Sequence, residues 1–531
     1  MSDSARRCDV LIIGGGMAGL ACALELPRGL DVVLLSKTAL PSGSTYLAQG
    51  GMAAAVSPAD TIERHLDDTV RSGAGLVDRS VALRIISEGP RLVRRLLDWG
   101  VPLEGTGAGG SMEGGHSIRR VLHYKDSTGR FISNRLVDLC RQERRAEIIE
   151  SAFAINLITN RTGCPQSSGP TTTGETCLGA YVLMDSRVVT FLAGETVLAT
   201  GGAGKAYRYT SNDDTATGDG IAMAYRAGLP VRNMEFFQFH PTCLFHPDKR
   251  NFLITEALRG DGAKLLNLAG DRFMSKYDPE RMELAPRDVV ARAIDSEMKL
   301  HGNDHVLLDC THLDEDALRS RYPQVTDGVM GVGILPWKQP IPVVPAAHYS
   351  VGGVSAAPDG GTDMPGLRAI GETSCTGFHG ANRLGSNSLL EAGVMGLLSA
   401  ESIARSRPRP FPGEVRDWYF GRAEPLEENV LVDHAWAALR SVMWDYVGIV
   451  RTVKRLLRAM RVVETIMREA EEDYWDLLPR VELLELRNLA SVCSIVVESA
   501  LERKESRGLH YNRDYPATLP EPSDTIIRKR P

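Results

Sequence analysis

Arginine and histidine side chains stand in several segments that glycine or proline flanks, where binding and catalysis tend to concentrate. Arg287 follows a proline, Arg383 lies in a glycine-rich segment, and His240 and His348 lie within three residues of a proline. An arginine fork matches a carboxylate in shape and charge, and a dicarboxylate held at both ends cannot rotate away from a reactive group. Taken alone, each residue fits a surface salt bridge or a satisfied histidine better. Only the set together favours a site for a doubly acidic molecule.

A glycine-rich turn near the N-terminus has the spacing of a dinucleotide-binding site. An apolar run at 9–13 leads directly into this turn. Gly14 permits a tight turn, Gly16 lets backbone N–H groups approach a pyrophosphate, and Gly19 lets the following helix pack close to its strand. The pattern predicts FAD or NAD at the N-terminus of that helix, and a tight turn without a ligand is the alternative. The residues expected at the cofactor are Gly14, Gly15, Gly16, Met17, Ala18 and Gly19.

The second strand of this β-α-β unit is expected at 31–37. An acidic residue usually stands at its end to hold a ribose hydroxyl, but this chain has Ser36 and Lys37 there. The departure disfavours NAD. Lys37 fits a place near the adenosine half of the cofactor and, equally well, a solvated lysine at a strand end.

The order of patterns predicts an α/β fold followed by helices. Two further strands of nucleotide-binding type, at 195–202 and 366–372, indicate a discontinuous Rossmann-like FAD-binding domain formed by 1–235 and 347–410. The segment 236–346, with a different mix of His, Arg and Pro, is expected to be an inserted α+β capping domain over the substrate. From 411 to 531 apolar residues recur at three- and four-residue spacing, notably at 447–460 and 480–490, which predicts a C-terminal helical bundle. The turn-rich tract 165–174 is expected to be a solvated loop.

Composition narrows the class of protein. The 531 residues exceed one hydrophobic core, and a net charge of -6 gives no reason to expect nucleic acid or a membrane as partner. Nine cysteines without a Cys-x-x-Cys pair argue against an iron–sulfur cluster, structural zinc or a disulfide framework, so no metal is expected. No secretory signal and no apolar run near the ~20 residues of a membrane span is present. A cytoplasmic protein with reduced thiols is therefore expected.

Over nearly its whole length the chain resembles the flavoproteins of the succinate dehydrogenase and fumarate reductase family. The resemblance rests on the segments 43–55, 200–202 and 366–372 and on six motifs in family order. These are Glu113-Gly-Gly-His-Ser117, Gln238-Phe-His-Pro-Thr242, Thr255-Glu-Ala-Leu-Arg-Gly260, Leu284-Ala-Pro-Arg-Asp288, Pro345-Ala-Ala-His-Tyr349 and His379-Gly-Ala-Asn-Arg-Leu-Gly-Ser-Asn-Ser388.

The resemblance implies roles for these residues. Arg287 corresponds to the arginine that moves a proton at the substrate carbon, and Glu256 and Arg259 to its relay. Their three-residue spacing places the relay pair on one helical face. The expected carboxylate-binding set is Thr255, His240, His348 and Arg383, with Gln238 and Ser386 adding hydrogen bonds.

The family also implies how the flavin is held. Ser44 replaces the histidine that carries covalent flavin in succinate dehydrogenase, so non-covalent FAD is expected. The helical pattern at 386–400 is expected to direct its N-terminus at the flavin, where a positive helix end stabilises an anionic reduced ring. Asp219 and Glu372 are expected to reach the cofactor, with helix-capping or turn roles as alternatives. The remaining expected cofactor contacts are Ser36, Lys37, Ser44, Thr45, Gln49, Gly50, Gly51, Ser388 and Leu389.

Glu113 separates the possible substrates. Dehydrogenases and fumarate reductases of the family usually carry an apolar residue at this position, whereas an acid suits an amine. Glu113 could pair with the α-ammonium of aspartate, a group that succinate lacks, and losing such a buried partner would cost on the order of a few kcal/mol in recognition. Taken alone it would be a solvated loop charge.

The resemblance therefore implies FAD-dependent oxidation of L-aspartate to iminoaspartate, with oxygen or fumarate as electron acceptor. This reaction is the first step of NAD biosynthesis through quinolinate, and it raises the prospect of transient contact with quinolinate synthase. The alternatives are a soluble fumarate reductase or succinate dehydrogenase flavoprotein, and a flavin-binding scaffold without turnover. Ser44 and Glu113 count against the former, and the intact set of Arg287, Arg383 and the two histidines counts against the latter.

Overall fold

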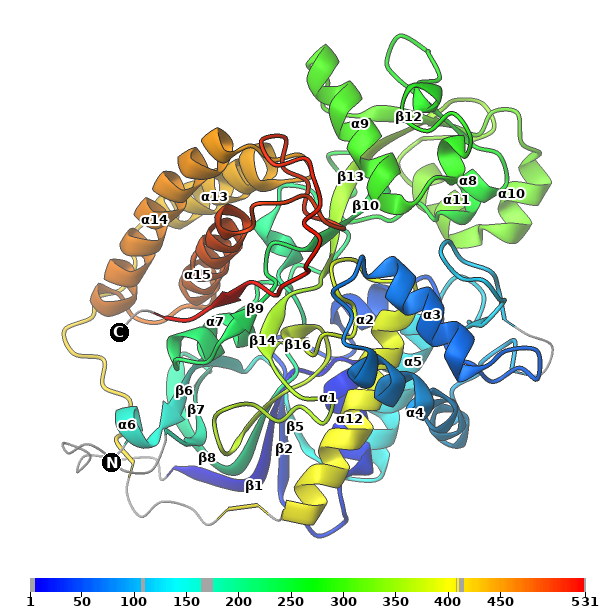
Figure 1. Cartoon of the computed structure of the whole chain (residues 1–531). Coiled ribbons are helices and arrows are strands. Elements are labelled where there is room, and N and C mark those ends of the chain that lie inside the picture. The colour runs from blue at the N-terminus through cyan, green and yellow to red at the C-terminus, as the bar shows by residue number, and fades with distance from the viewer. Residues whose placement is uncertain (1–4, 107–109, 164–174, 407, 410–414, 530–531) are drawn as a thin grey trace.

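The computed structural model describes residues 5–106, 110–163, 175–406, 408–409 and 415–529 (Figure 1). Within these ranges the large sheet has seven strands, in the order β5-β2-β1-β8-β7-β6, with β15 also pairing with β8. The first strand and its neighbours on either side run parallel, and Val10–Ile13 are buried because both faces of the sheet are covered. The strands are β1 (Arg6–Ile13), β2 (Val32–Leu35), β5 (Glu147–Ile149), β6 (Phe153–Thr159), β7 (Cys177–Met184), β8 (Arg187–Leu198) and β15 (Leu367–Ala369).

Helices α1 (Met17–Glu25) and α12 (Asn387–Ser406) pack closely together beside this sheet (Figure 1). A Cβ at Gly396 of α12 would lie 2.7 Å from the Ala18 carbonyl oxygen, so glycine permits the close approach. The helix expected from residue 386 thus begins at Asn387. The same core includes α3 (Ile62–Ser72), α4 (Arg79–Asp98) and α5 (Thr128–Gln142).

A second, four-stranded sheet lies apart from the first, at the upper right of Figure 1. Its strands are antiparallel, in the order β10-β13-β12-β11, and its helices pack around a separate core that includes Phe273 and Ile294. The elements are β10 (Phe237–Leu244), α8 (Ala257–Gly260), β11 (Lys264–Leu266), η2 (Met274–Lys276), η3 (Met282–Leu284), α9 (Arg287–His301), β12 (Val306–Asp309), α10 (Glu315–Arg321), α11 (Pro323–Met330) and β13 (Ile341–Ser350).

The C-terminal region contains the long helices α13 (Val430–Val447), α14 (Val453–Asp476) and α15 (Val481–Glu502). The continuous helical pattern read at 447–460 is wrong in one respect, because it spans the end of α13 and the start of α14. Gly448 ends the first helix, and the Thr452 hydroxyl accepts a hydrogen bond from the Arg455 N–H and caps the second. The tail then returns as β17 (Ile526–Ile527), which pairs with β9 (Val231–Arg232).

Shorter elements complete the description. They are α2 (Gly43–Leu47), β3 (Met52–Ala53), β4 (Val121–Leu122), α6 (Asn160–Gly163), η1 (Gly204–Ala206), α7 (Asp219–Arg226), β14 (Gly353–Ser355), η4 (Gly371–Thr373) and β16 (Ser374–Cys375). Among the described helices none is long and apolar enough to cross a membrane. Eight cysteines are free and buried, while Cys164 and the whole tract 165–174 lie outside the described residues.

Candidate active site

One large cavity, of about 1590 Å³, runs between the glycine turn after β1 and the unit built on the four-stranded sheet. Residues from both units line it, including Gly14, Glu113, Arg287, His348 and Arg383. Side chains more than 250 residues apart in the sequence therefore share one wall. All the residues predicted for cofactor or substrate line this cavity, with the exceptions of Gly19 and Gln238.

The glycine turn packs closely against neighbouring backbone because side chains are missing. A Cβ on Gly14, whose φ is 120°, would lie 2.2 Å from the Ala199 carbonyl oxygen. A Cβ on Gly19 would lie 2.1 Å from the Gly14 carbonyl oxygen, so Gly19 serves close strand–helix packing behind the cavity. Gly16 directly precedes α1 and lines the cavity, so the N-terminus of the helix borders the space where a pyrophosphate would bind.

Lys37 is held in a charge cluster. Its ammonium lies 2.8 Å from Asp219 and 2.6 Å from Glu485, and its side chain is only 15% exposed. Burial alone would lower the pKa of Lys37, but these two carboxylates outweigh burial and raise it. Lys37 is therefore a charged, internally paired residue at the cavity wall, and the alternative of a solvated strand-end lysine is excluded.

Two polar side chains on the cavity wall have capacity for further hydrogen bonds. Within the described residues the buried Gln49 Oε1 has no hydrogen-bond partner. Glu372 follows β15 and accepts a hydrogen bond from the Ser350 N–H at 2.9 Å. Burial raises the pKa of Glu372 to about 7, so its carboxyl can donate as well as accept near neutral pH.

Arg383 is a buried cation surrounded by neutral groups. Its guanidinium donates to Gln238 Oε1 at 2.7 Å and to Ser388 Oγ at 2.9 Å, and it lies 4.6 Å from the centre of the Tyr349 ring. No carboxylate in the described part of the chain forms an ion pair with it. Burial, followed by the charge of Arg287, lowers the pKa of Arg383 to about 10, which still leaves it charged at neutral pH.

Gln238 stands behind Arg383 rather than on the cavity wall. Its amide oxygen accepts from Arg383, and its amide nitrogen donates to Asn382 Oδ1 and to the Arg383 carbonyl oxygen. Both the oxygen and the nitrogen of the Gln238 side-chain amide are thereby engaged. The expectation that Gln238 bonds directly to substrate thus gives way to a role in orienting Arg383.

A second arginine cluster lines the same cavity, where α8 meets the first residue of α9. Arg287 Nε donates to Glu256 Oε2 at 2.5 Å, and Arg259 Nη2 lies 3.6 Å from Glu256 Oε1. Burial would raise the pKa of Glu256, but the two arginines outweigh it and hold the pKa at about 2. Nε and Nη2 of Arg259 are buried without a hydrogen-bond partner among the described residues. The side chains of Arg287, Glu256 and Arg259 therefore form a continuous polar path. Arg259 Nε and Nη2 remain available on this path to donate further hydrogen bonds.

The two histidines and Thr255 line the cavity between these arginines. The rings of His240 and His348 are 5.5 Å apart, and Ser211 Oγ lies 2.7 Å from His348 Nδ1. Burial, together with Arg287 for one ring and Arg383 for the other, lowers both histidine pKa values well below the ordinary value. The histidines are therefore neutral hydrogen-bonding groups, and arginine carries the positive charge of the site.

Glu113 faces the same cavity. Its Oε2 accepts a hydrogen bond from Ser386 Oγ at 2.8 Å, and Ser386 directly precedes α12. A Cβ on Gly385 would lie 2.9 Å from the same oxygen, so the Glu113 carboxylate is in close contact with the segment that carries Arg383. The cavity wall thus combines the guanidinium of Arg383, which has no ion-pair partner among the described residues, with the carboxylate of Glu113. This carboxylate contacts Gly385 and Ser386, two and three residues after Arg383.

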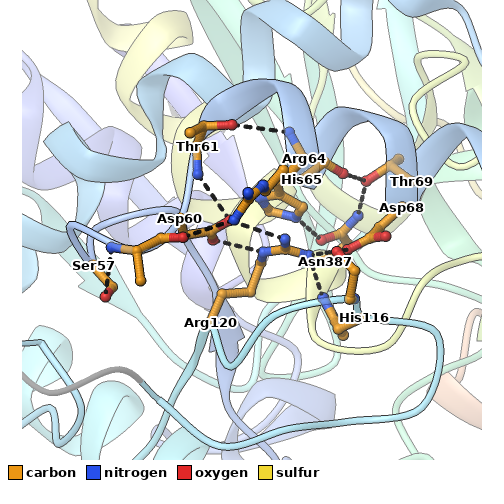
Figure 2. A network of polar contacts seen from close by, with 12 residues as sticks. Ser57, Asp60, Thr61, Arg64, His65, Asp68, Thr69, His116, Arg120 and Asn387 are labelled. Carbon is orange, nitrogen blue, oxygen red and sulfur yellow. Dashed lines mark hydrogen bonds and ion pairs between the residues drawn. The ribbon is translucent and has the colours of Figure 1, made fainter.

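Sequence reasoning missed the buried groups that hold this wall. Figure 2 shows Arg120 between Asp60 and Asp68, with His116 beside it. Ser211 and Tyr349 likewise support His348 and Arg383. No spacing rule could reveal Ser211, which lies 137 residues from its partner. By contrast, His116 lies within the motif at 113–117 and Arg120 follows it by three residues. Their short spacing beside a motif could have marked both as candidates from the sequence.

Comparison with known proteins identifies two family models. A model described as an FAD binding domain matches residues 9–389, and one described as the fumarate reductase flavoprotein C-terminus matches residues 436–528. The chain is 48% identical to the L-aspartate oxidase of Pseudomonas aeruginosa, over 98% of this chain and 97% of that protein. It is 40% identical to the chloroplastic L-aspartate oxidase of Arabidopsis thaliana, over 97% of this chain and 82% of that protein.

Solved structures with the same fold include FrdA of E. coli quinol fumarate reductase. It is 29% identical, with a TM-score of 0.85, over 98% of this chain and 94% of that chain. Sdh1 of Mycobacterium smegmatis is 30% identical, with a TM-score of 0.82 and the same coverage. The similarity extends through the C-terminal helices as well as the nucleotide-binding sheet.

Proposed function

This chain belongs to the L-aspartate oxidase family of FAD-binding flavoproteins, and we propose which of its residues carry each part of the reaction. It is an FAD-dependent oxidoreductase that oxidises L-aspartate to iminoaspartate, a step of NAD biosynthesis. The division of labour described below is supported by the geometry of the cavity.

The residues at the glycine turn fit FAD. A Cβ at Gly16, just before α1, would meet only Thr45 Oγ1 at 3.6 Å, so the start of the helix borders open cavity where a pyrophosphate fits. The free Gln49 oxygen and the Glu372 carboxyl offer hydrogen bonds to a ring edge or to sugar hydroxyls. When bound, FAD accepts the hydride that leaves the α-carbon of aspartate. Ser44, on α2, cannot form a histidyl bond, so the proposal includes non-covalent binding. Acid denaturation should release all of the flavin into the supernatant, whereas retained protein-bound flavin would refute non-covalent binding.

Arg383 and the neutral histidines hold the two carboxylates. Arg383 supplies a charge that no internal acid among the described residues neutralises, so a substrate carboxylate completes its coordination. His240, His348 and Thr255 add hydrogen bonds without adding charge. Two anchored carboxylates fix the orientation of the carbon between them.

Glu113 recognises the amine. Its carboxylate lies on the same wall as Arg383 and has Oε1 free of any hydrogen bond that the structure records, whereas Oε2 accepts from Ser386. An acid beside a carboxylate-binding site disfavours a plain dicarboxylate and favours one that carries a positive charge. This position of Glu113 is the observation on which the proposed recognition of an amino dicarboxylate depends.

Arg287, Glu256 and Arg259 move protons. Oxidation of the carbon–nitrogen bond removes a hydride from carbon and a proton from nitrogen, and reduction of fumarate requires a proton at carbon. Arg287 reaches the cavity and is bonded to Glu256, which Arg259 approaches from the other side. The path can carry a proton between the substrate and the protein interior without exposing the substrate to bulk water.

Oxygen and fumarate are the proposed electron acceptors, and fumarate binds through the same carboxylate contacts. We further propose that the FAD-binding domain comprises 1–235 and 347–410, that 236–346 covers the substrate, and that 411–531 forms the helical domain. The protein is proposed to act in the cytoplasm, with at most transient contact with quinolinate synthase.

Replacing Glu113 by glutamine tests the proposed recognition. Glu113→Gln should lower kcat/KM for aspartate oxidation by roughly 10- to 100-fold, because a charge-assisted contact with the ammonium is lost. Fumarate reduction by the same variant should change by less than about threefold, because fumarate has no amine. Equal losses in the two reactions would show that Glu113 does not recognise the amine.

A further inference from the structure

Figure 2 shows a buried ion cluster formed by Arg120, Asp60 and Asp68, with His116 beside it. Arg120 Nε lies 2.8 Å from Asp60, and Arg120 Nη1 lies 2.5 Å from Asp68, with all three side chains at most 1% exposed. Asp68 also accepts hydrogen bonds from the Ser117 N–H and hydroxyl at 2.8 Å. The cluster therefore fixes the segment after Glu113 to α3, which carries Asp68.

His116 connects this cluster to the segment that contains Gly385. Its Nδ1 lies 3.0 Å from Arg120 Nη1, and its Nε2 lies 2.9 Å from the Gly385 carbonyl oxygen. Arginine only donates hydrogen bonds, so Nδ1 must accept and Nε2 must carry the proton that it donates to Gly385. The surroundings thus assign one neutral tautomer to His116, and burial, which lowers its pKa, acts in the same direction.

The Gly385 end of this bridge lies next to the Glu113 carboxylate. Ser386, the next residue, donates to Glu113 Oε2, and the backbone N–H of His116 donates to the Glu113 carbonyl oxygen at 3.2 Å. Arg383 is two residues before Gly385. His116 therefore provides a second link, beside the Ser386–Glu113 hydrogen bond, between the Glu113 segment and the segment that carries Arg383.

We propose that His116 is a positioning residue for substrate specificity, which sets the place of the Glu113 carboxylate relative to Arg383 through its hydrogen bond to Gly385. The proposal rests on the proposed recognition of the amine by Glu113. A displacement of about 1 Å between the two charges is enough to weaken binding of an amino dicarboxylate strongly. A dicarboxylate without an amine uses Arg383 but not Glu113, so it is affected much less.

Two matched variants separate the two hydrogen bonds of His116. The side chain of His116→Asn places an oxygen near the position of Nδ1, where it accepts from Arg120, but it is too short to reach Gly385. The side chain of His116→Gln places an amide N–H near the position of Nε2 and keeps the bond to Gly385. The readout is kcat/KM for aspartate oxidation divided by kcat/KM for fumarate reduction, with flavin content and the thermal midpoint measured alongside.

The ratio should fall by about tenfold in His116→Asn and stay within about threefold of wild type in His116→Gln. Equal ratios in the two variants would overturn the proposal. Ser386→Ala provides a second route, because it leaves the ion cluster intact and removes only the hydroxyl that reaches Glu113. It should lower the ratio in the same direction, and an unchanged ratio would also overturn the link.

A double variant distinguishes failure of this proposal from failure of the amine assignment. If His116 acts through Glu113, adding His116→Asn to Glu113→Gln should lower the ratio no further than Glu113→Gln alone. A full additional tenfold loss would contradict the role of His116 and leave the role of Glu113 intact. An unaltered ratio in Glu113→Gln alone would instead refute the amine assignment on which the proposal rests.

Discussion

Two buried arginines, Arg120 and Arg383, differ in what surrounds their charge. Arg120 is 1% exposed and forms ion pairs with two carboxylates, so its charge is compensated inside the fold. Arg383 is 5% exposed and, within the ranges that the structure describes, contacts only amide, hydroxyl and aromatic groups. One cation faces the interior and the other faces the large cavity.

The contrast distinguishes a structural charge from a functional one. Burial of an uncompensated charge costs several kcal/mol (about 3–5 when one partner of a buried pair is removed). A fold that keeps Arg383 without an ion pair among the described residues is therefore less stable until a carboxylate of the substrate binds to it. Arg287 lies between these extremes, because it faces the cavity but is already bonded to Glu256.

Substitution of Arg383 by methionine should give the largest effect on catalysis. We expect Arg383→Met to lower kcat/KM for aspartate oxidation and for fumarate reduction by roughly 10³-fold, because both substrates lose the cation that meets a carboxylate. The free energy of unfolding should change by less than about 2 kcal/mol, since no ion pair is lost. Steady-state kinetics and urea titration measure the two quantities. If Arg383→Met lowered the free energy of unfolding as much as Arg120→Met does, the distinction between a functional and a structural arginine would be contradicted.

The corresponding change at the structural arginine should have the opposite profile. Arg120→Met leaves Asp60 buried without a counter-charge and leaves Asp68 with only the exposed Arg71 as its ion-pair partner, so we expect the free energy of unfolding to fall by about 3–5 kcal/mol. Fumarate reduction per folded, flavin-loaded molecule should fall far less than in Arg383→Met. Urea unfolding at one flavin concentration tests this, and unchanged stability would show that the cluster is not a structural element.

Glu256 sharpens the comparison with Arg287. Glu256→Gln should lower kcat for fumarate reduction by about 100-fold with little change in KM, because it interrupts proton transfer but leaves carboxylate binding intact. The pKa of Glu256 is held at about 2, below its ordinary value, so its ion pair persists above pH 4 and is lost only as the pH falls toward 2. Wild-type rates between pH 5 and 8 should show no ionisation of this carboxyl. A rise in KM as large as the fall in kcat would assign Glu256 to binding instead.

The smallest effect is expected at Glu372, which lines the cavity and accepts a hydrogen bond from the Ser350 N–H. Its pKa is raised to about 7, so its contribution to stability is complete below about pH 4.5 and is lost as the pH rises through about 7. In flavin-free protein, the unfolding free energy of wild type relative to Glu372→Gln should fall between pH 5 and 8, by at most about 1.4 kcal/mol per unit of pH. A pH-independent difference between the two proteins would show that Glu372 is not protonated in the fold.

Local sequence patterns predicted the parts of the site that depend on backbone conformation. The turn at Gly14–Gly19 needs residues without a Cβ, and the helix from Asn387 needs a polar start followed by apolar spacing, and both requirements are visible in the sequence. The motif residues converge on one cavity as the family resemblance implied. Arg287, Arg383 and His348 all line it.

Features that depend on contacts between distant segments were not predictable in the same way. The amide of Gln238 has the same chemistry whether it meets a substrate or Arg383, and only the fold decides between them. Lys37 is buried because Glu485, 448 residues later, reaches it. The break between α13 and α14 was missed because apolar spacing continues across Gly448.

Anaerobic mixing of the flavin-loaded protein with substrate tests the central claim, recognition of a dicarboxylate that carries an amine, most directly. The flavin absorbance near its visible maximum should bleach on addition of L-aspartate and should stay unchanged on addition of an equal concentration of succinate. Bleaching by succinate alone would indicate a dicarboxylate dehydrogenase, and bleaching by neither would indicate a protein without turnover. Either of these results would contradict the assignment of Glu113 and Arg383.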